Sequence, residues 1–186
     1  MGVGKTTAIK FFEEYKFSIF IMDQYIHKIY QKNEIGYQLI KKHFGVEFVN
    51  VICVDRTKLR KYILKNNQNL EKLNNLIFPI IEKQLDFLIK TNIQYVVELG
   101  IYIYNHNIFA KYFNKVIIIT ANRENIIDFF KNIHGVLKFS TKCVEKYENT
   151  NKKQLILADY IVENNESESE FKKKIIEIIQ KIKNRI

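Results

Sequence analysis

The chain opens with the stretch Met-Gly-Val-Gly-Lys-Thr-Thr (MGVGKTT, residues 1–7), which decides the predicted fold. Gly4, Lys5 and Thr6 match the last three positions of the phosphate-loop pattern G-x-x-x-x-G-K-[ST]. Glycines allow backbone amides to approach a phosphate, and the helix that follows directs its positive end at the anion. We expect Lys5 to reach the β- and γ-phosphate oxygens of a nucleotide, and the Thr6 hydroxyl to bind Mg²⁺.

The motif is incomplete at its amino-terminal side. Its first glycine would lie two positions before Met1, and no strand precedes the loop. In doubly wound folds this strand lies in the middle of the sheet, and its removal would leave backbone groups unpaired. We therefore expect the natural chain to begin upstream of Met1. The alternative is that Gly-Lys-Thr at a true terminus is a coincidence.

Apolar runs of strand length alternate with helical periodicities along the rest of the chain. This alternation indicates βαβ units around a parallel sheet that is covered on both faces. The sequence thus predicts an α/β fold with three layers, of the phosphate-loop type. Pro79 is expected to open or bend one of the helices. The expected helices are 6–15, 25–44 (ending at Gly45), 57–65, 69–90, 123–132 and 168–183, and the expected strands are 17–22, 94–99, 115–120 and 159–163.

Asp23 follows the first of these strands directly. An acid at the carboxyl end of a parallel strand lies on the ligand-binding edge of the sheet. There Asp23 could accept a hydroxyl proton or contact Mg²⁺ through water. It could equally be the N-cap of a helix that starts near Tyr25, and the sequence leaves both interpretations open.

Charge and composition restrict the possible functions further. The 186 residues carry a net charge of +10, which would attract nucleic acid or phosphorylated small molecules, or which reflects only a lysine-rich composition. Two cysteines, Cys53 and Cys143, exclude a disulfide framework and a cysteine-based zinc site. We expect a cytoplasmic protein without a membrane segment or signal peptide, because no apolar run reaches about 18 residues. No module typical of nucleic-acid binding is visible, so nucleic acid is not an expected partner.

Seven segments occur together in an order and spacing that resemble the dephospho-CoA kinase family. They are GVGKTT, MDQYIHKIY, HFG, VDRTKLRKYI, LEKLNNLIFPII, KVIIIT and LADYIVENN. The resemblance implies one phosphate-loop kinase domain with a helical substrate-binding insert at 57–92 and a lid at 124–154. It also implies that ATP donates its γ-phosphate to the 3′-hydroxyl of dephospho-CoA, in the last step of coenzyme A biosynthesis.

The same resemblance suggests roles for individual residues. Asp23 matches the acid to which the family assigns the base role. His27 and Arg56 fall at substrate-binding positions, where Arg56 could hold a substrate phosphate. The residues expected to hold the ATP phosphates, with Mg²⁺ bound at Thr6, are Gly2, Val3, Gly4, Lys5, Thr6 and Thr7.

The chain also departs from the family pattern. Ile21 replaces the first acid of an Asp-x-Asp pair, Phe78 replaces the histidine of a His-Pro motif, and ELGIYIYN (residues 98–105) replaces Pro-Leu-Leu-x-Glu. Phe129 and Ile133 stand where the lid normally carries arginines, whose loss would slow phosphoryl transfer. Two alternatives to the dephospho-CoA kinase therefore stay open: a catalytically weakened nucleotide- or CoA-binding protein, and a related nucleoside or nucleotide kinase. The sequence leaves the oligomeric state open.

Overall fold

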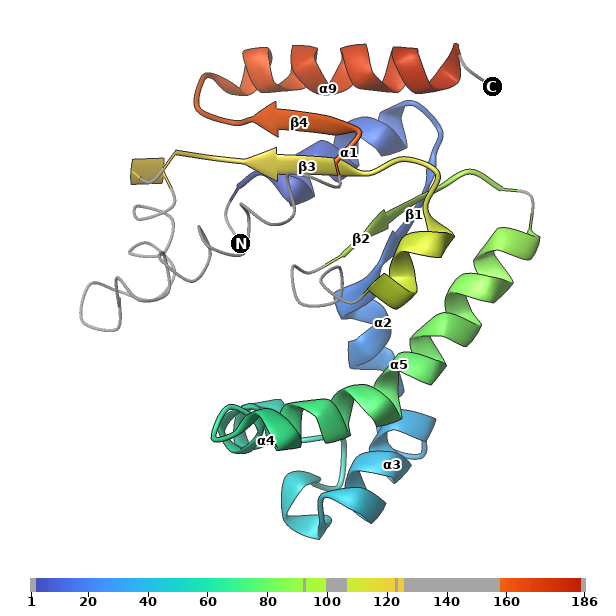
Figure 1. The fold of residues 1–186 in the computed structure, drawn as a ribbon, viewed down its shortest axis with the longest axis vertical. Coiled ribbons are helices and arrows are strands. Elements are labelled where there is room, and N and C mark those ends of the chain that lie inside the picture. The colour runs from blue at the N-terminus through green and yellow to red at the C-terminus, as the bar shows by residue number, and fades with distance from the viewer. Residues whose placement is uncertain (1–2, 92, 100–106, 123, 126–157, 185–186) are drawn as a thin grey trace. The chain divides into compact units, whose positions relative to one another are not determined.

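The structure is a computed structural model that describes residues 3–91, 93–99, 107–122, 124–125 and 158–184. The chain divides into two compact units (Figure 1). The first unit contains Met1–Phe20 and Gln94–Ile186, and the second contains Ile21–Ile93. The predicted insert at 57–92 lies within the second unit, and its role in substrate binding stays a prediction.

All four predicted strands are present, and they belong to or begin in the first unit. β1 (Ser18–Ile21) pairs with β2 (Tyr95–Glu98), whereas β3 (Ile117–Thr120) pairs with β4 (Tyr160–Glu163). The β3–β4 pair is parallel, with Ile117 opposite Tyr160 and Thr120 opposite Glu163. The predicted class, mixed helices and strands with parallel pairing, is confirmed. We expected one continuous sheet, but the strands within the described residues form two separate pairs.

Two amphipathic helices cover the core of this unit. α1 (Lys5–Glu14) and α9 (Glu168–Lys183) pack against each other, and α9 also packs against β4 (Figure 1). α9 spans the residues that its apolar periodicity predicts, and it begins after Ser167, whose hydroxyl accepts a hydrogen bond from the Glu170 amide at 3.3 Å. The core formed by these elements consists of Ala8, Phe11, Phe12, Phe17, Val162, Phe171, Ile175, Ile178 and Ile179.

The second unit is helical: α2 (Met22–Ile29), α3 (Ile35–His43), the short 3₁₀ helix η1 (Val46–Phe48), α4 (Arg56–Ile63) and α5 (Asn67–Lys90). The prediction of a single helix over 25–44 was wrong, because α2 ends before residue 30 and α3 starts at residue 35.

The break between α2 and α3 is caused by pairing with a distant segment. The Lys32 amide donates to the Ile52 carbonyl at 2.7 Å, and the Val54 amide donates to the Tyr30 carbonyl at 2.9 Å. Asn33 adopts a left-handed backbone with φ of 72°, a conformation that asparagine tolerates better than most residues. The residues between the helices are therefore held by bonds to residues 52–54, which helical periodicity cannot reveal.

α5 contains Pro79 in its interior, and Figure 1 shows the helix changing direction along its length. The proline ring removes one backbone donor and crowds the carbonyl four residues earlier, so a bend is the expected result. No helix among the described residues is long and apolar enough to cross a membrane. The predicted helix at 123–132 and the predicted lid at 124–154, with Phe129 and Ile133, lie almost entirely outside the described residues.

Candidate functional site: a phosphate loop and an acid–histidine–arginine face

The Gly-Lys-Thr motif forms the start of a helix, as the phosphate-loop interpretation requires. α1 begins at Lys5, and Gly4 precedes it with φ of 96°. The first amides of a helix have no partners within the helix, and they carry its positive dipole end. Thr6 is exposed and Thr7 is half-buried, while Val3 is buried. Gly2 lies outside the described residues.

Lys5 is held by two acceptors at the carboxyl end of β2. Its ammonium nitrogen forms an ion pair with Glu98 Oε1 and donates a hydrogen bond to the Leu99 carbonyl at 3.2 Å. The Lys5 side chain is 32% exposed and that of Glu98 is 16% exposed. The lysine of the motif is therefore fixed at the loop by a mostly buried carboxylate.

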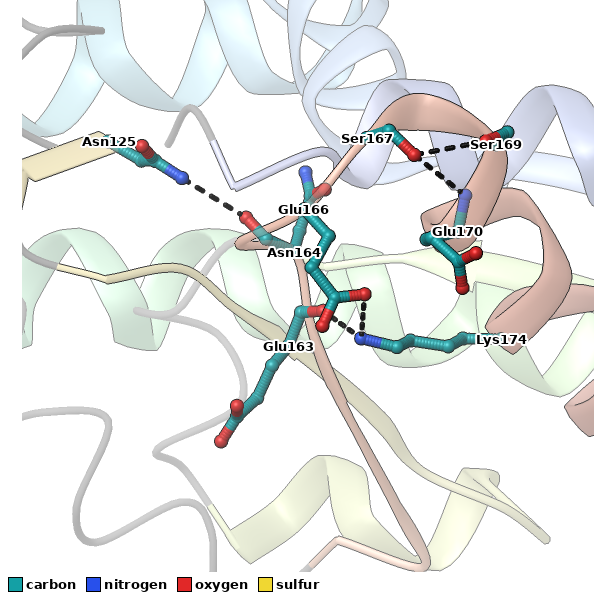
Figure 2. A network of polar contacts seen from close by, with 8 residues as sticks. All are labelled: Asn125, Glu163, Asn164, Glu166, Ser167, Ser169, Glu170 and Lys174. Atoms are coloured by element: carbon teal, nitrogen blue, oxygen red, sulfur yellow. Dashed lines mark hydrogen bonds and ion pairs between the residues drawn. The ribbon is translucent and has the colours of Figure 1, made fainter.

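Asn164 ties the loop to the turn that follows β4. Its side-chain amide donates to the Val3 carbonyl at 3.2 Å, and its backbone amide donates to the Thr120 carbonyl at 2.8 Å. Asn125 donates in turn to the Asn164 carbonyl at 3.4 Å, as Figure 2 shows. One residue thus connects the segment before α1, the end of β3 and the segment that follows β3.

The same turn is anchored to α9 by a lysine. Lys174 donates to the Glu163 carbonyl at 3.3 Å and pairs with the Glu166 carboxylate at 3.0 Å (Figure 2). The Ser167 hydroxyl lies 2.9 Å from that of Ser169 at the start of the helix. These contacts fix the turn on both sides of Asn164. The turn can therefore hold the segment before α1 through the bond from Asn164 to Val3.

The backbone angle at Gly4 and the space around its Cα both favour glycine at this position. Its left-handed φ is one that side chains rarely adopt, and a Cβ there would lie 2.5 Å from Asn164 Nδ2 and 3.2 Å from the Phe171 ring. Any larger residue would have to displace the asparagine that holds the loop or the aromatic ring behind it.

Replacing Gly4 with alanine is expected to abolish nucleotide binding and to destabilise the fold by about 1–2 kcal/mol through backbone strain alone. A titration with an ATP analogue and a thermal unfolding curve measure the two effects. Gly45→Ala is the matched control, since Gly45 also has a positive φ of 120° but belongs to the other unit. Normal nucleotide binding by Gly4→Ala would contradict the assigned loop geometry.

Asp23 lies in the first turn of α2, not at its N-cap. The cap position belongs to Ile21, so the alternative interpretation of Asp23 as an N-cap was wrong. The side chain is exposed, and among the described residues no hydrogen bond or ion pair fixes its carboxylate. A carboxylate in the first turn is compatible with the helix dipole, and this one is accessible to a substrate.

His27 and Arg56, both predicted to bind substrate, are in direct contact. His27 lies one turn after Asp23 on the same face of α2, and its Nδ1 is 3.0 Å from Arg56 Nη1. Because a guanidinium only donates, Nδ1 accepts this bond, which leaves the imidazole proton on Nε2. The second unit therefore presents an acid, a histidine and an arginine on one face.

Arg56 is held at the start of a capped helix and lies near a buried phenol. Arg56 is the first residue of α4, whose N-cap Asp55 accepts a hydrogen bond from the Lys58 amide at 2.9 Å. Burial raises the pKa of the Tyr30 phenol to about 12, and the nearby positive charge of Arg56 offsets part of this shift. A neutral Tyr30 phenol carries no charge that would compete with an anion for the Arg56 guanidinium.

Sequence reasoning missed two residues of this site, Glu98 and Asn164. Glu98 ends a predicted strand, so the rule that parallel strands end at the ligand-binding edge could have identified it. Asn164 lies in the turn that follows the predicted strand at 159–163. Its bond to Val3 crosses 161 positions of sequence, and no local pattern indicates such a contact.

The residues present fit a magnesium ion that a nucleotide brings with it. Within the described part of the chain, no group of three or more His, Cys, Asp or Glu side chains could hold a metal. Mg²⁺ usually takes only one or two protein oxygens together with phosphates and water. The exposed hydroxyl of Thr6 is one such oxygen donor at the loop.

A family model described as dephospho-CoA kinase matches residues 1–170 of the chain. The dephospho-CoA kinase of Mycoplasma genitalium is 47% identical over 81 residues, which cover 43% of this chain and 41% of that protein. The dephospho-CoA kinase of Mycoplasma pneumoniae is 34% identical over 120 residues, which cover 62% and 60% of the two chains. These alignments thus span about half the length of the two relatives.

One solved structure has a similar fold. The dephospho-CoA kinase from Campylobacter jejuni superposes with a TM-score of 0.70 over 100% of this chain and 95% of that chain, at 22% sequence identity. At this identity the likeness concerns the fold only. Because the family model covers most of the chain, this protein belongs to the dephospho-CoA kinase family.

Proposed function

We propose that the protein transfers the γ-phosphate of ATP to the 3′-hydroxyl of dephospho-CoA and thereby forms coenzyme A. The observation that carries the proposal is a Gly-Lys-Thr motif at the start of α1 in a chain whose residues 1–170 match this family. On the acceptor side, support comes from Asp23, whose carboxylate has no hydrogen bond or ion pair among the described residues, and from the contact between His27 and Arg56.

The proposed fold has three layers around a parallel sheet of the phosphate-loop type, with a helical substrate-binding insert at residues 57–92 of the second unit. Support comes from the shared core of the first unit. Ile19 of β1, Val96 of β2, and Ile117 and Ile119 of β3 all pack against the same cluster of α1 and α9 side chains. Both strand pairs therefore contribute to one hydrophobic core, as two parts of a single layer would.

On the donor side, Lys5 and the first amides of α1 hold the β- and γ-phosphates of ATP. The ammonium group neutralises charge on the phosphate oxygens as the bond between the β–γ bridging oxygen and the γ-phosphorus breaks. Thr6 contributes its hydroxyl oxygen to Mg²⁺, which supplies further charge neutralisation when it is bound with the nucleotide. ADP is the leaving group.

On the acceptor side, Asp23 orients the 3′-hydroxyl and takes its proton as the oxygen bonds to phosphorus. An exposed carboxylate without a competing partner among the described residues suits this role. Arg56 and His27 bind the phosphate groups that dephospho-CoA already carries, because a guanidinium fork and an Nε2–H donor match phosphate oxygens.

Replacing Arg56 with alanine is expected to raise the KM for dephospho-CoA about 10- to 100-fold, the effect of losing a charge-assisted hydrogen bond worth about 1.5–3 kcal/mol. The KM for ATP should stay the same. Arg60→Ala is the matched control, because Arg60 is an exposed arginine one turn later in α4. Steady-state kinetics with each substrate varied in turn measures both constants. Equal effects of the two variants would argue against a substrate site at Arg56.

A further inference from the structure

We propose that the second unit binds single-stranded nucleic acid on a surface formed by the end of α3, one side of α4 and the start of α5, here called the lysine–aromatic surface. Its residues are Phe44, Lys58, Lys61, Tyr62 and Lys72. α4 packs against α5, and Lys72 ties α5 to the end of α3 by donating to the His43 carbonyl at 2.6 Å (Figure 1). The sequence predicted no nucleic-acid partner, because these residues come from three separate segments.

Tyr62 provides the ring on which a base stacks. Its ring centroid lies 5.0 Å from that of Phe48 and 6.2 Å from that of Phe44, so two neighbouring rings fix its orientation. Phe48 is buried, whereas Tyr62 is 37% exposed. Bases of any sequence stack on exposed aromatic rings, and each stack contributes about 1–3 kcal/mol to binding. The orientation of this platform is therefore set before a strand binds.

Lysines lie beside the two rings that support the tyrosine. The Lys58 ammonium is 6.0 Å from the centre of the Phe48 ring, and the Lys72 ammonium is 5.0 Å from the centre of the Phe44 ring. Lys61 lies one turn after Lys58 in α4. All three lysines are exposed, and none of them forms an ion pair with another described residue. Their charges are thus available to the phosphates of a strand whose bases stack on the tyrosine.

The lysine–aromatic surface is separate from the acid–histidine–arginine face. Lys58 and Tyr62 are four residues apart and share one side of α4. At about 3.6 residues per turn, position 58 is rotated about 200° from position 56. Arg56, which contacts His27, therefore lies on the opposite side of the helix. A strand on the lysine–aromatic surface leaves that face open to substrate.

Charge favours a polyanion as the partner, and the exposed ring favours nucleic acid among polyanions. Residues 56–70 contain no acidic side chain, and the whole chain carries a net charge of +10. A single strand offers phosphates and unpaired planar bases at regular spacing. An anionic lipid surface or an acidic peptide supplies the charge without the regularly spaced rings.

The test is a fluorescence anisotropy titration with a labelled oligothymidylate of 12 nucleotides and with an abasic strand of the same length. For the unmodified chain we expect oligothymidylate to bind at least fivefold more tightly than the abasic strand. Its dissociation constant should rise about 20-fold between 50 and 200 mM salt, the effect of neutralising about three phosphates of a single strand. Excess dephospho-CoA should not displace it.

Two sets of variants separate stacking from charge. Tyr62→Ala should weaken binding of oligothymidylate about 5- to 100-fold, whereas Tyr62→Phe keeps the ring and should stay within twofold. The pair Lys58→Glu/Lys61→Glu should weaken it at least tenfold. Lys83→Glu/Lys90→Glu is the matched control, because it changes the net charge equally at exposed lysines further along α5, and it should cost less than threefold.

Three results would each overturn the inference. Equal binding of the abasic strand would indicate a general polyanion surface, such as one for anionic lipid or acidic protein. Equal losses in the two double variants would indicate an effect of net charge alone. Displacement by dephospho-CoA would assign the surface to the substrate. Thermal unfolding curves accompany each variant, and if Tyr62→Ala does not fold, the abasic strand and the exposed lysine pairs decide the outcome.

Discussion

Lys5→Ala is expected to lower the rate of phosphoryl transfer by at least about 10²–10³-fold, the usual effect of removing one donor that stabilises developing charge. Lys5 is the first residue of α1 and the lysine of the Gly-Lys-Thr motif. The measurement is the initial rate of coenzyme A formation at saturating ATP. Lys10→Ala is the matched control, because Lys10 is an exposed lysine of the same helix.

The loss of Lys5 also leaves Glu98 without its partner, so part of any effect could come from a destabilised fold. The double variant Lys5→Ala/Glu98→Gln separates the two causes. It should recover thermal stability relative to Lys5→Ala and stay equally inactive. Activity restored in the double variant, or retained above a tenth in the single variant, would show that Lys5 has no part in the transfer.

Asp23→Asn is expected to reduce turnover by about 10²–10⁴-fold while nucleotide affinity stays unchanged, because the amide cannot accept the hydroxyl proton. The substitution keeps the size of the side chain, and no hydrogen bond or ion pair to another described residue is lost. Rate measurements and a nucleotide titration on the same preparation test both parts of the prediction.

Asp86→Asn provides the control for Asp23→Asn, since Asp86 is an exposed aspartate of α5 in the same unit. It should keep full activity. Turnover near that of the unmodified chain in Asp23→Asn would show that another group accepts the proton, whereas an equal loss in Asp86→Asn would indicate a general effect of charge.

The sequence predicted best where the structure depends on local patterns. The apolar spacing of α9 and the runs that became β1 to β4 were all found, because burial on one face leaves a periodic trace. The start of α1 at the Gly-Lys-Thr motif was predicted for a similar reason, since glycine, lysine and threonine before an apolar periodicity are a compact local pattern.

Features that depend on distant contacts were not predictable. The helix expected over 25–44 is interrupted because residues 30–32 pair with residues 52–54. The ion pair between Lys5 and Glu98 spans 93 positions, and the bond from Asn164 to Val3 spans 161. The arrangement of the strands as two pairs is likewise a property of the folded unit, which no single run of sequence records.

The sequence predicted individual residues of the candidate site but not how they contact one another. Lys5 and Thr6 lie in the first turn of α1, whereas the contact between His27 and Arg56 was not predicted. The substrate roles of these residues stay predictions until the variants are measured.

The most direct test of the central claim is a phosphoryl-transfer assay with the purified chain, Mg-ATP and dephospho-CoA, in which mass spectrometry detects coenzyme A. AMP and adenosine serve as alternative acceptors. The account predicts that coenzyme A accumulates with time, that Lys5→Ala abolishes its formation, and that neither alternative acceptor is phosphorylated at a comparable rate. A folded chain that binds ATP and dephospho-CoA but forms no coenzyme A would contradict the claim and indicate a binding protein instead.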